Sequence, residues 1–161
     1  MIKVSKPNDD DYFELSVMVG ELLTEIMEKI KIKAFSYNQE KTEGRARDLI
    51  KKNKYWVFIA KDTNANESVG FVSMYESYAL YSEGEYGTIP ELYVRPAYRS
   101  KKIGEILLKK ASEFALQKQW KRLEVTTPPL PEFERTINFY QNNGFSITGG
   151  RKLKLDIATI E

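Results

Sequence analysis

The sequence has 161 residues, of which 42% are hydrophobic, and both values are normal for one compact domain with a substantial core. Lysine and arginine number 25 against 23 acidic residues, so the formal net charge of +2 does not favour a polyanion as the main partner. The absence of cysteine and histidine excludes disulfides, the usual zinc ligands and a cysteine nucleophile. Carboxylates, tyrosines and backbone groups are left for any chemistry, and no metal cofactor is expected.

No hydrophobic segment of the chain is of the kind that enters a membrane. No apolar run approaches the roughly 20 residues that span a bilayer. The first residues, MIKVSKPNDDDYF, lack the apolar core of a signal peptide. Repeats and low-complexity linkers are also absent from the sequence. We therefore expect one domain over residues 1–161, a cytoplasmic location and no membrane partner.

The first third of the sequence predicts a short strand followed by two helices. Residues 2–5 alternate apolar and polar side chains, and Pro7-Asn8-Asp9 supplies a turn with helix-start chemistry. A second, more polar helix is predicted from Gln39 to Lys52. The first helix, over residues 12–30, is predicted by apolar residues at steps of three and four: Leu15, Met18, Val19, Leu22, Leu23, Ile26 and Ile30.

The middle of the sequence predicts the centre of a sheet. YWVFIA at residues 55–60 is rich in aromatic and β-branched side chains, and the polar turn DTNANE separates it from VGFVSMY at residues 69–75. Together these segments predict a β-hairpin. A third strand, TIPELYV at residues 88–94, contains Pro90, which cannot donate to a ladder of hydrogen bonds. We expect an edge or a bulge at this proline.

The last third predicts two helices, each followed by at least one strand. After the first of these helices, a strand is predicted from Leu123 to Thr126. The second helix starts near Pro131 and ends at Asn143-Gly144, before terminal strands near residues 145–147 and 152–157. The first helix is indicated by a stripe of residues at helical spacing: Ile103, Ile106, Leu107, Lys110, Ala111, Phe114 and Ala115.

Four cations crowd the start of the helix predicted at Ile103, and these are Arg95, Arg99, Lys101 and Lys102. A helix N-terminus already carries partial positive charge and unpaired backbone N–H groups. Clustered cations are therefore unfavourable there unless an anion such as a phosphate occupies the site. The alternative is that the side chains point into water, where screened repulsion costs well under about 1 kcal/mol. The charge pattern alone leaves both interpretations open.

The segment Arg99-Ser100-Lys101-Lys102-Ile103-Gly104 resembles the pyrophosphate-binding motif of the GNAT superfamily of acyl-CoA-dependent N-acetyltransferases, R/Q-x-x-G-x-G/A after a strand. Lys102 replaces the first glycine of this motif, which makes close backbone approach to a phosphate harder but leaves a lysine side chain to contact it. A second match, INFYQNNGF at residues 137–145, resembles the tyrosine-bearing helix of the family. The predicted order of elements is similar to the GNAT fold over nearly the whole chain.

The resemblance implies an α/β (α+β) fold with a mixed, mostly antiparallel sheet of about seven strands flanked by four helices. In such a fold the fourth and fifth strands splay apart, and acetyl-CoA, the co-substrate, binds in the cleft between them. The fourth strand is expected here over Ile89 to Arg95. By resemblance, the cofactor-binding residues are Leu92, Tyr93, Val94, Arg99, Ser100, Lys101, Lys102, Ile103, Gly104 and Asn138.

The resemblance also implies that an acetyl group passes from acetyl-CoA to a primary amine by direct attack in a ternary complex. Glu91 is the candidate general base, acting through water, and its alternative is an outward-facing strand residue. Strand alternation places Glu91 on the face opposite Leu92, so its reach depends on the phase of the bulge. Tyr140 is the candidate proton donor to the leaving thiolate, and its alternative role is core packing beside Phe133 and Ile137.

The sequence does not identify the amine acceptor, and it leaves alternatives open for the function, the oligomeric state and one acidic segment. The main alternative function is a non-catalytic acyl-CoA sensor of the same fold, and the balanced charge argues against a nucleic-acid partner. The alternation of Leu153, Leu155 and Ile157 could serve a homodimer interface or the core. One acidic and aromatic segment could attract a cationic amine or could simply be a surface loop: Glu76, Tyr78, Tyr81, Glu83, Glu85 and Tyr86.

Overall fold

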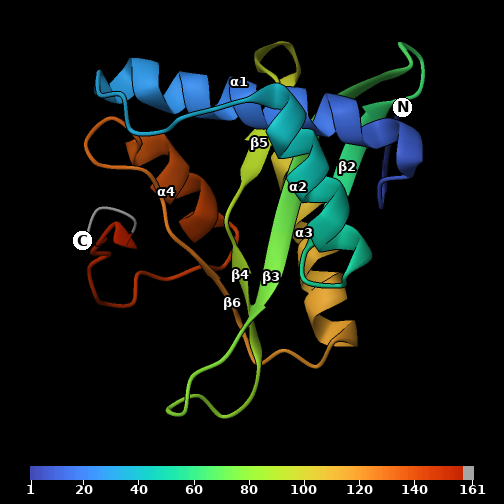
Figure 1. Ribbon diagram of the computed structural model, residues 1–161. Helices are drawn as coiled ribbons and strands as arrows, with labels where there is room; N and C mark the ends of the chain where they lie inside the picture. Colours follow the sequence, from blue (N-terminus) through green and yellow to red (C-terminus); the bar gives the residue numbers. More distant parts are fainter. Residues whose placement is uncertain (158–161) are drawn as a thin grey trace.

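A six-stranded sheet with helices on both faces forms the fold (Figure 1). The computed structural model describes residues 1–157 of the chain. In chain order the elements are β1 (Ile2–Ser5), the 3-10 turn Asp9–Asp11, α1 (Tyr12–Ile30), α2 (Gln39–Lys51), β2 (Trp56–Asp62), β3 (Glu67–Ser77), β4 (Tyr86–Ile89), β5 (Leu92–Val94), the 3-10 turn Pro96–Tyr98, α3 (Ile103–Gln117), β6 (Leu123–Val125) and α4 (Glu134–Asn142).

The strands follow the order β1-β2-β3-β4-β6, and β5 pairs with β3 beyond the end of β4. Every pairing is antiparallel except that of β4 with β6, which is parallel. β2 and β3 form the predicted central hairpin, with Trp56 opposite Met74 and Asp62 opposite Glu67. These pairings confirm the predicted mixed, mostly antiparallel sheet.

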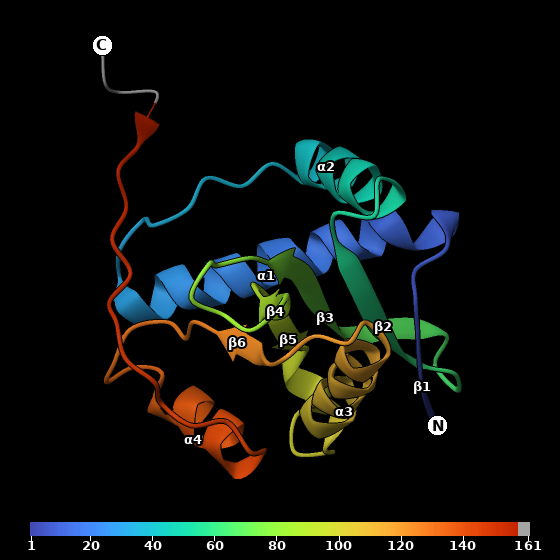
Figure 2. The same ribbon diagram turned by 90° about the horizontal axis from the view of Figure 1, so that it is seen from below.

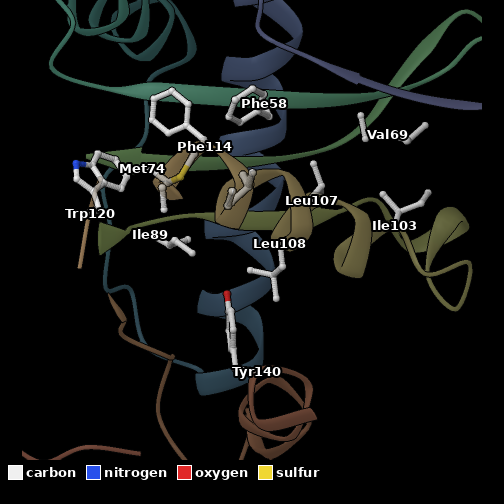
Figure 3. Close-up of a cluster of buried hydrophobic side chains, with 14 residues drawn as sticks. Phe58, Val69, Met74, Ile89, Ile103, Leu107, Leu108, Phe114, Trp120 and Tyr140 are labelled. Carbon is white, nitrogen blue, oxygen red and sulfur yellow. The ribbon is translucent and has the colours of Figure 1, made fainter. Parts of the chain in front are cut away.

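Each face of the sheet is covered by two helices. Figure 2 shows α1 and α2 on one side of the sheet and α3 and α4 on the other. Side chains of β2 alternate between the two cores, because Val57 and Ile59 pack toward α1, whereas Phe58 and Ala60 pack toward α3. Figure 3 shows the core on the α3 side. A fully buried Leu, Ile or Phe side chain contributes roughly 1.5–3 kcal/mol, so these two cores hold the helices on the sheet.

A bulge at Pro90 divides the predicted third strand into β4 and β5. Val72 of β3 lies opposite Leu92, and Tyr75 lies opposite Thr88. Residues 73–74 of β3 therefore face residues 89–91, which places one extra residue on the strand that contains the proline. The structure thus confirms the predicted bulge, and the bulge sets the direction of the residue that follows the proline.

Beyond the bulge, the sheet opens between β5 and the chain that leaves β6. β4 pairs with β6 from Gly87 opposite Leu123 to Ile89 opposite Val125, and the pairing ends there. Among the described strands, β5 pairs only with β3. The predicted fourth strand corresponds to β4 and β5, and the predicted fifth strand corresponds to β6. Their separation beyond the bulge is the predicted splay, and it leaves one edge of β5 without a strand partner.

The sheet has six strands in the described residues, not about seven, because the predicted terminal strands at 145–147 and 152–157 are not formed there. An extended segment becomes a strand only when a neighbour satisfies its backbone groups, and alternation of side chains does not supply that neighbour. Ile147, Leu153, Leu155 and Ile157 are 72–88% exposed. These side chains are therefore not part of the core, which was one of the two alternatives for Leu153, Leu155 and Ile157.

α1 and α2 begin at their predicted residues, and polar side chains cap the turn before α1 and the start of α2. Asn8 and Asp11 form a capping box directly before α1, and the Asn38 side chain accepts from the backbone N–H of Lys41 at the start of α2. α2 ends at Lys51, one residue before the predicted end. None of the helices in residues 1–157 has the length and apolar character of a membrane span.

Candidate functional site

A cavity of about 1090 Å³ lies where the sheet opens, and residues from both faces of the sheet line it. On one face the lining comes from α1 and the connection after it. On the other face it comes from the start of α3 and from α4, while β5 and residues 125–129 form the two sides. This volume is at the upper end of the range for small-molecule sites. The cavity is therefore continuous through the sheet at the splay.

The loop before α3 lines the cavity and has an unusual backbone conformation. Ser100 and Lys102 have positive φ angles of 69° and 62°, and Lys102 occupies the N-cap position of α3 without a side-chain capping bond. Lys102 thus adopts the backbone conformation that glycine favours, at the position where the GNAT motif has its first glycine. Both residues line the cavity, as do Ile103 and Gly104, whereas Lys101 does not.

Gly104 allows α3 and α4 to approach each other beside this loop. A Cβ atom at Gly104 would lie 2.9 Å from Cζ of Phe139, which is shorter than real contacts. The second small residue of the predicted phosphate motif therefore has a packing role that the sequence did not reveal. Its absent side chain lets α4 pack against the first turn of α3.

Arg99 lines the cavity but is held by an ion pair. Its Nη1 atom lies 2.7 Å from Oε1 of Glu25 on α1, and its Nε atom donates to the carbonyl of Val94 at 2.9 Å. Arg95 is paired with Glu14 and Glu21 of the same helix and does not line the cavity. Helix α1 thus neutralises both arginines of the predicted cluster.

The open edge of β5 presents backbone groups to the cavity. The carbonyl of Glu91 accepts from the N–H of Ser73, and the N–H of Arg95 donates to the carbonyl of Val69. Because backbone groups alternate in direction along an antiparallel strand, those of Leu92 and Val94 point to the opposite edge, which has no strand partner, although the Val94 carbonyl accepts there from Arg99. Tyr93 also lines the cavity, and burial with the neighbouring Glu21 raises the pKa of its hydroxyl to about 12.

Tyr140 reaches the cavity from α4. Figure 3 shows its side chain extending from α4 toward the sheet, beside Leu108 and Ile89. The residue is 7% exposed, and its ring packs edge-on against Phe139 and Phe145 with centroids 5.3 Å away. Burial alone raises the pKa of the Tyr140 hydroxyl well above its usual value. The hydroxyl therefore stays protonated at neutral pH and can act as a proton donor.

Glu91 points toward the face of the sheet that α1 and α2 cover. Its Oε1 atom accepts from the Tyr55 hydroxyl at 2.6 Å and from the Ser73 hydroxyl in a shorter bond. A small cavity of about 80 Å³, lined by Glu91, Tyr55, Ser73, Ser16 and residues of α2, lies beside this carboxylate, and Glu91 lines the large cavity as well. Apolar side chains, among them Leu15, Val19 and Phe71, form most of the rest of its lining.

Hydrogen bonds also occupy the backbone next to the bulge. The N–H of Glu91 donates to Oγ of Ser73 at 3.2 Å, so it is not available to a ligand. The N–H groups on the open edge of β5 are the alternative donors. Burial and the nearby Glu91 charge raise the pKa of Tyr55 strongly, so this tyrosine remains a donor to the carboxylate.

A family profile described as an acetyltransferase (GNAT) domain matches residues 51–147, which is more than half of the chain. The chain belongs to the GNAT acetyltransferase family. The matched residues include β2 to β6, α3 and α4, and they leave out β1, α1 and nearly all of α2. A search of curated proteins finds no matching sequence.

Solved structures share the GNAT fold over almost the whole chain. An acetyltransferase of Trypanosoma brucei is 17% identical, with 98% of this chain and 100% of that chain covered at a TM-score of 0.72. A transcriptional regulator from Bacillus halodurans is 21% identical, with 96% and 100% covered at 0.76. The aminoglycoside N-acetyltransferase AAC(6')-Iy, in complex with CoA, is 12% identical, with 98% and 95% covered at 0.79.

Several residues singled out from the sequence lie outside the cavity of this GNAT domain. Asn138 and Lys101 do not line it. The acidic and aromatic segment, for which amine attraction and a surface loop were the two alternatives, does not line it either. Glu76 instead accepts from Nε1 of Trp120 at 2.7 Å and from the Tyr78 hydroxyl. Within residues 1–157, no group of three or more carboxylates is placed to hold a metal ion.

The GNAT site also contains residues that the sequence analysis did not identify. Tyr55 and Ser73 hold Glu91, but they appeared only as members of strands. Glu25 binds Arg99 from a helix that the sequence marks only by its apolar stripe. These contacts join residues 18 to 74 positions apart, so no local spacing signals them.

Proposed function

We propose that the protein is an N-acetyltransferase that transfers the acetyl group of acetyl-CoA to a primary amine by direct attack in a ternary complex. The observation that carries this proposal is that one cavity, continuous through the splayed sheet, is lined by Glu91 and by Tyr140. The two groups approach it from opposite faces. A carboxylate that accepts protons and a hydroxyl that donates one are the groups that acyl transfer to an amine requires.

Acetyl-CoA supplies the activated acetyl thioester, and the residues around the cavity fit its parts. The loop from Arg99 to Gly104 opens a helix N-terminus toward the cavity, which suits a pyrophosphate. The unpaired edge of β5 offers backbone donors and acceptors that suit the amides of a pantetheine chain. The Leu92 N–H on this edge is the donor that we assign to the thioester oxygen, on which negative charge develops during attack.

Glu91 would act on the amine. Its Oε1 atom is occupied by Tyr55 and Ser73, which fixes the carboxylate and leaves its other oxygen to accept a proton from the ammonium through water. The freed nitrogen lone pair then forms a bond to the acetyl carbon as the bond from that carbon to sulfur breaks, and the nitrogen releases its second proton to solvent to become a neutral amide. Tyr55 and Ser73 are positioning residues in this scheme, because they act through Glu91.

Tyr140 would complete the reaction on the other face of the sheet. The electron pair of the broken bond leaves with sulfur, and the Tyr140 hydroxyl supplies the proton that turns the thiolate into a thiol. The buried position keeps this proton on the hydroxyl until the thiolate forms. Tyr140 recovers a proton from solvent and Glu91 releases its proton to solvent, so the enzyme returns to its starting state.

A non-catalytic acyl-CoA sensor is the second candidate function. A structure similar to this chain bears the name of a transcriptional regulator, so proteins with this fold need not be named as enzymes. The presence of both Glu91 and Tyr140 on the cavity favours catalysis. The two candidates differ in whether bound acetyl-CoA is consumed.

The test is release of the CoA thiol from acetyl-CoA by the purified protein in the presence of a mixed panel of primary amines. We expect thiol release that depends on an amine and yields the matching acetylated product. Tyr140→Phe is the control, because it removes the proton donor and keeps the ring. Tight binding of acetyl-CoA with no amine-dependent release would support the sensor instead.

A further inference from the structure

The wall of the cavity on the Glu91 face is apolar. Leu22, Leu23 and Ile26 of α1, which covers this face of the sheet, line the wall. Phe35, from the connection after α1, and Tyr75 of β3 also line it, and these two aromatic side chains are 39% and 38% exposed. Partly exposed rings on the wall of a cavity are surfaces that an apolar ligand can cover.

Few negative charges are available on this wall. Among the described residues, the carboxylates that line the cavity belong to Glu25, Glu91 and Glu105. Glu25 is bound to Arg99. Glu105 lies in the first turn of α3, beside the loop that suits a pyrophosphate. Glu91 is therefore the carboxylate that remains on the α1 face of the cavity.

Positive charges also line the cavity away from the loop before α3. Lys29 of α1 lies with Nζ 5.0 Å from the centre of the Phe133 ring, and Arg135 and Lys152 line the same cavity. An acceptor with several positive charges would meet these cations and, on the α1 face, only one carboxylate outside an ion pair. Burying a charge without a partner is costly, so such an acceptor fits poorly.

We propose that the acceptor is a monoamine with an apolar, aromatic body, whose single ammonium group meets Glu91 while the body packs on Leu22, Leu23 and Phe35. This inference rests on the proposed acetyl transfer. It does not use the acidic and aromatic segment, because that segment does not line the cavity. Polyamines, aminoglycosides and phosphorylated amino sugars would be poor acceptors.

The first experiment compares 2-phenylethylamine with spermidine and glucosamine 6-phosphate. Binding of each amine to the protein saturated with CoA is measured by calorimetry, and acetylation of each is measured with acetyl-CoA. We expect 2-phenylethylamine to exceed both others by at least about tenfold in affinity and in kcat/KM, which is the effect of burying one well-packed apolar group.

A pair of variants tests the wall itself. Leu23→Glu adds a carboxylate to the cavity lining, whereas Thr24→Glu adds the same group to an exposed position of α1 that does not line the cavity. We expect Leu23→Glu to weaken 2-phenylethylamine binding about tenfold and to improve spermidine binding. Thr24→Glu should leave both affinities unchanged.

The outcomes separate this inference from the proposed function. Preference for spermidine or the amino sugar in binding and turnover would overturn the monoamine class and leave the acetyltransferase proposal standing. Binding of 2-phenylethylamine without acetylation of any amine would support the site and contradict the acetyltransferase proposal. Absence of 2-phenylethylamine binding, or equal effects of the two glutamate variants, would overturn the inference.

Discussion

Tyr140 is the residue whose role is easiest to separate from packing. The ring packs against two phenylalanines, whereas the hydroxyl has no hydrogen-bond partner among the described residues. Removing the hydroxyl should therefore change the chemistry and spare the fold. For Tyr140→Phe we expect kcat to fall about 100-fold, with the Kd of acetyl-CoA unchanged. Steady-state kinetics and calorimetry check this, and an unchanged kcat would assign Tyr140 to the core alone.

Tyr55 tests whether Glu91 works as a positioned base. We expect Tyr55→Phe to lower kcat about tenfold, because Glu91 loses a hydrogen bond that fixes its carboxylate. In a Glu91→Gln background the same change should have little further effect, because both changes remove one function. The four rate constants of this double-mutant cycle are the measurement. If the two changes lower kcat independently, so that their effects multiply, Tyr55 supports the fold and does not position Glu91.

Some residues of the site could be assigned from the sequence, and others could not. Tyr140 was assigned from a motif carried on one helix, and the structure places it on the cavity. The position of Glu91 depended on the phase of the bulge, which only the pairing of Val72 with Leu92 reveals. Tyr55 could not be assigned, because its contact with Glu91 spans 36 positions of sequence.

At the scale of elements, the loop before α3 carries a conformational cost that a substitution can remove. Lys102 has a φ of 62°, whereas Lys101, its neighbour, does not have a positive φ. We expect Lys102→Gly to raise the free energy of unfolding by about 0.5–1 kcal/mol, because glycine adopts this conformation without a Cβ clash. Lys101→Gly should lower it by a similar amount through added entropy in the unfolded chain. Urea unfolding of both variants measures the difference, and equal effects would contradict it.

The elements were predictable where local pattern decides them. Apolar spacing and capping residues specify α1 and α2, and Pro90 marks the division between β4 and β5. The terminal strands were predicted wrongly, because a strand forms only beside a partner strand. β6 has only three residues with which another strand could pair. Residues 152–157 alternate as a strand does but pair with no strand in the described chain.

At the scale of the whole molecule, buried tyrosines link stability to alkaline pH. Burial raises the pKa of Tyr140 above its ordinary value near 10, so the folded state holds this proton more tightly than the unfolded chain. The resulting stability is present below about pH 10 and is lost as the pH rises above it. Tyr140→Phe should make this loss shallower by up to about 1.4 kcal/mol per pH unit. Urea unfolding from pH 9 to 11 checks this, and parallel curves would contradict it.

The central claim is that the splayed cavity binds acetyl-CoA through the open edge of β5 and the loop from Arg99 to Gly104. Calorimetric titration with acetyl-CoA tests it most directly, on the native protein, on Arg99→Ala and on Glu25→Gln. Glu25→Gln is the matched control, because it breaks the same ion pair and keeps the guanidinium. We predict micromolar binding that weakens at least about tenfold in Arg99→Ala and is kept in Glu25→Gln. Absence of acetyl-CoA binding to the native protein would contradict the account.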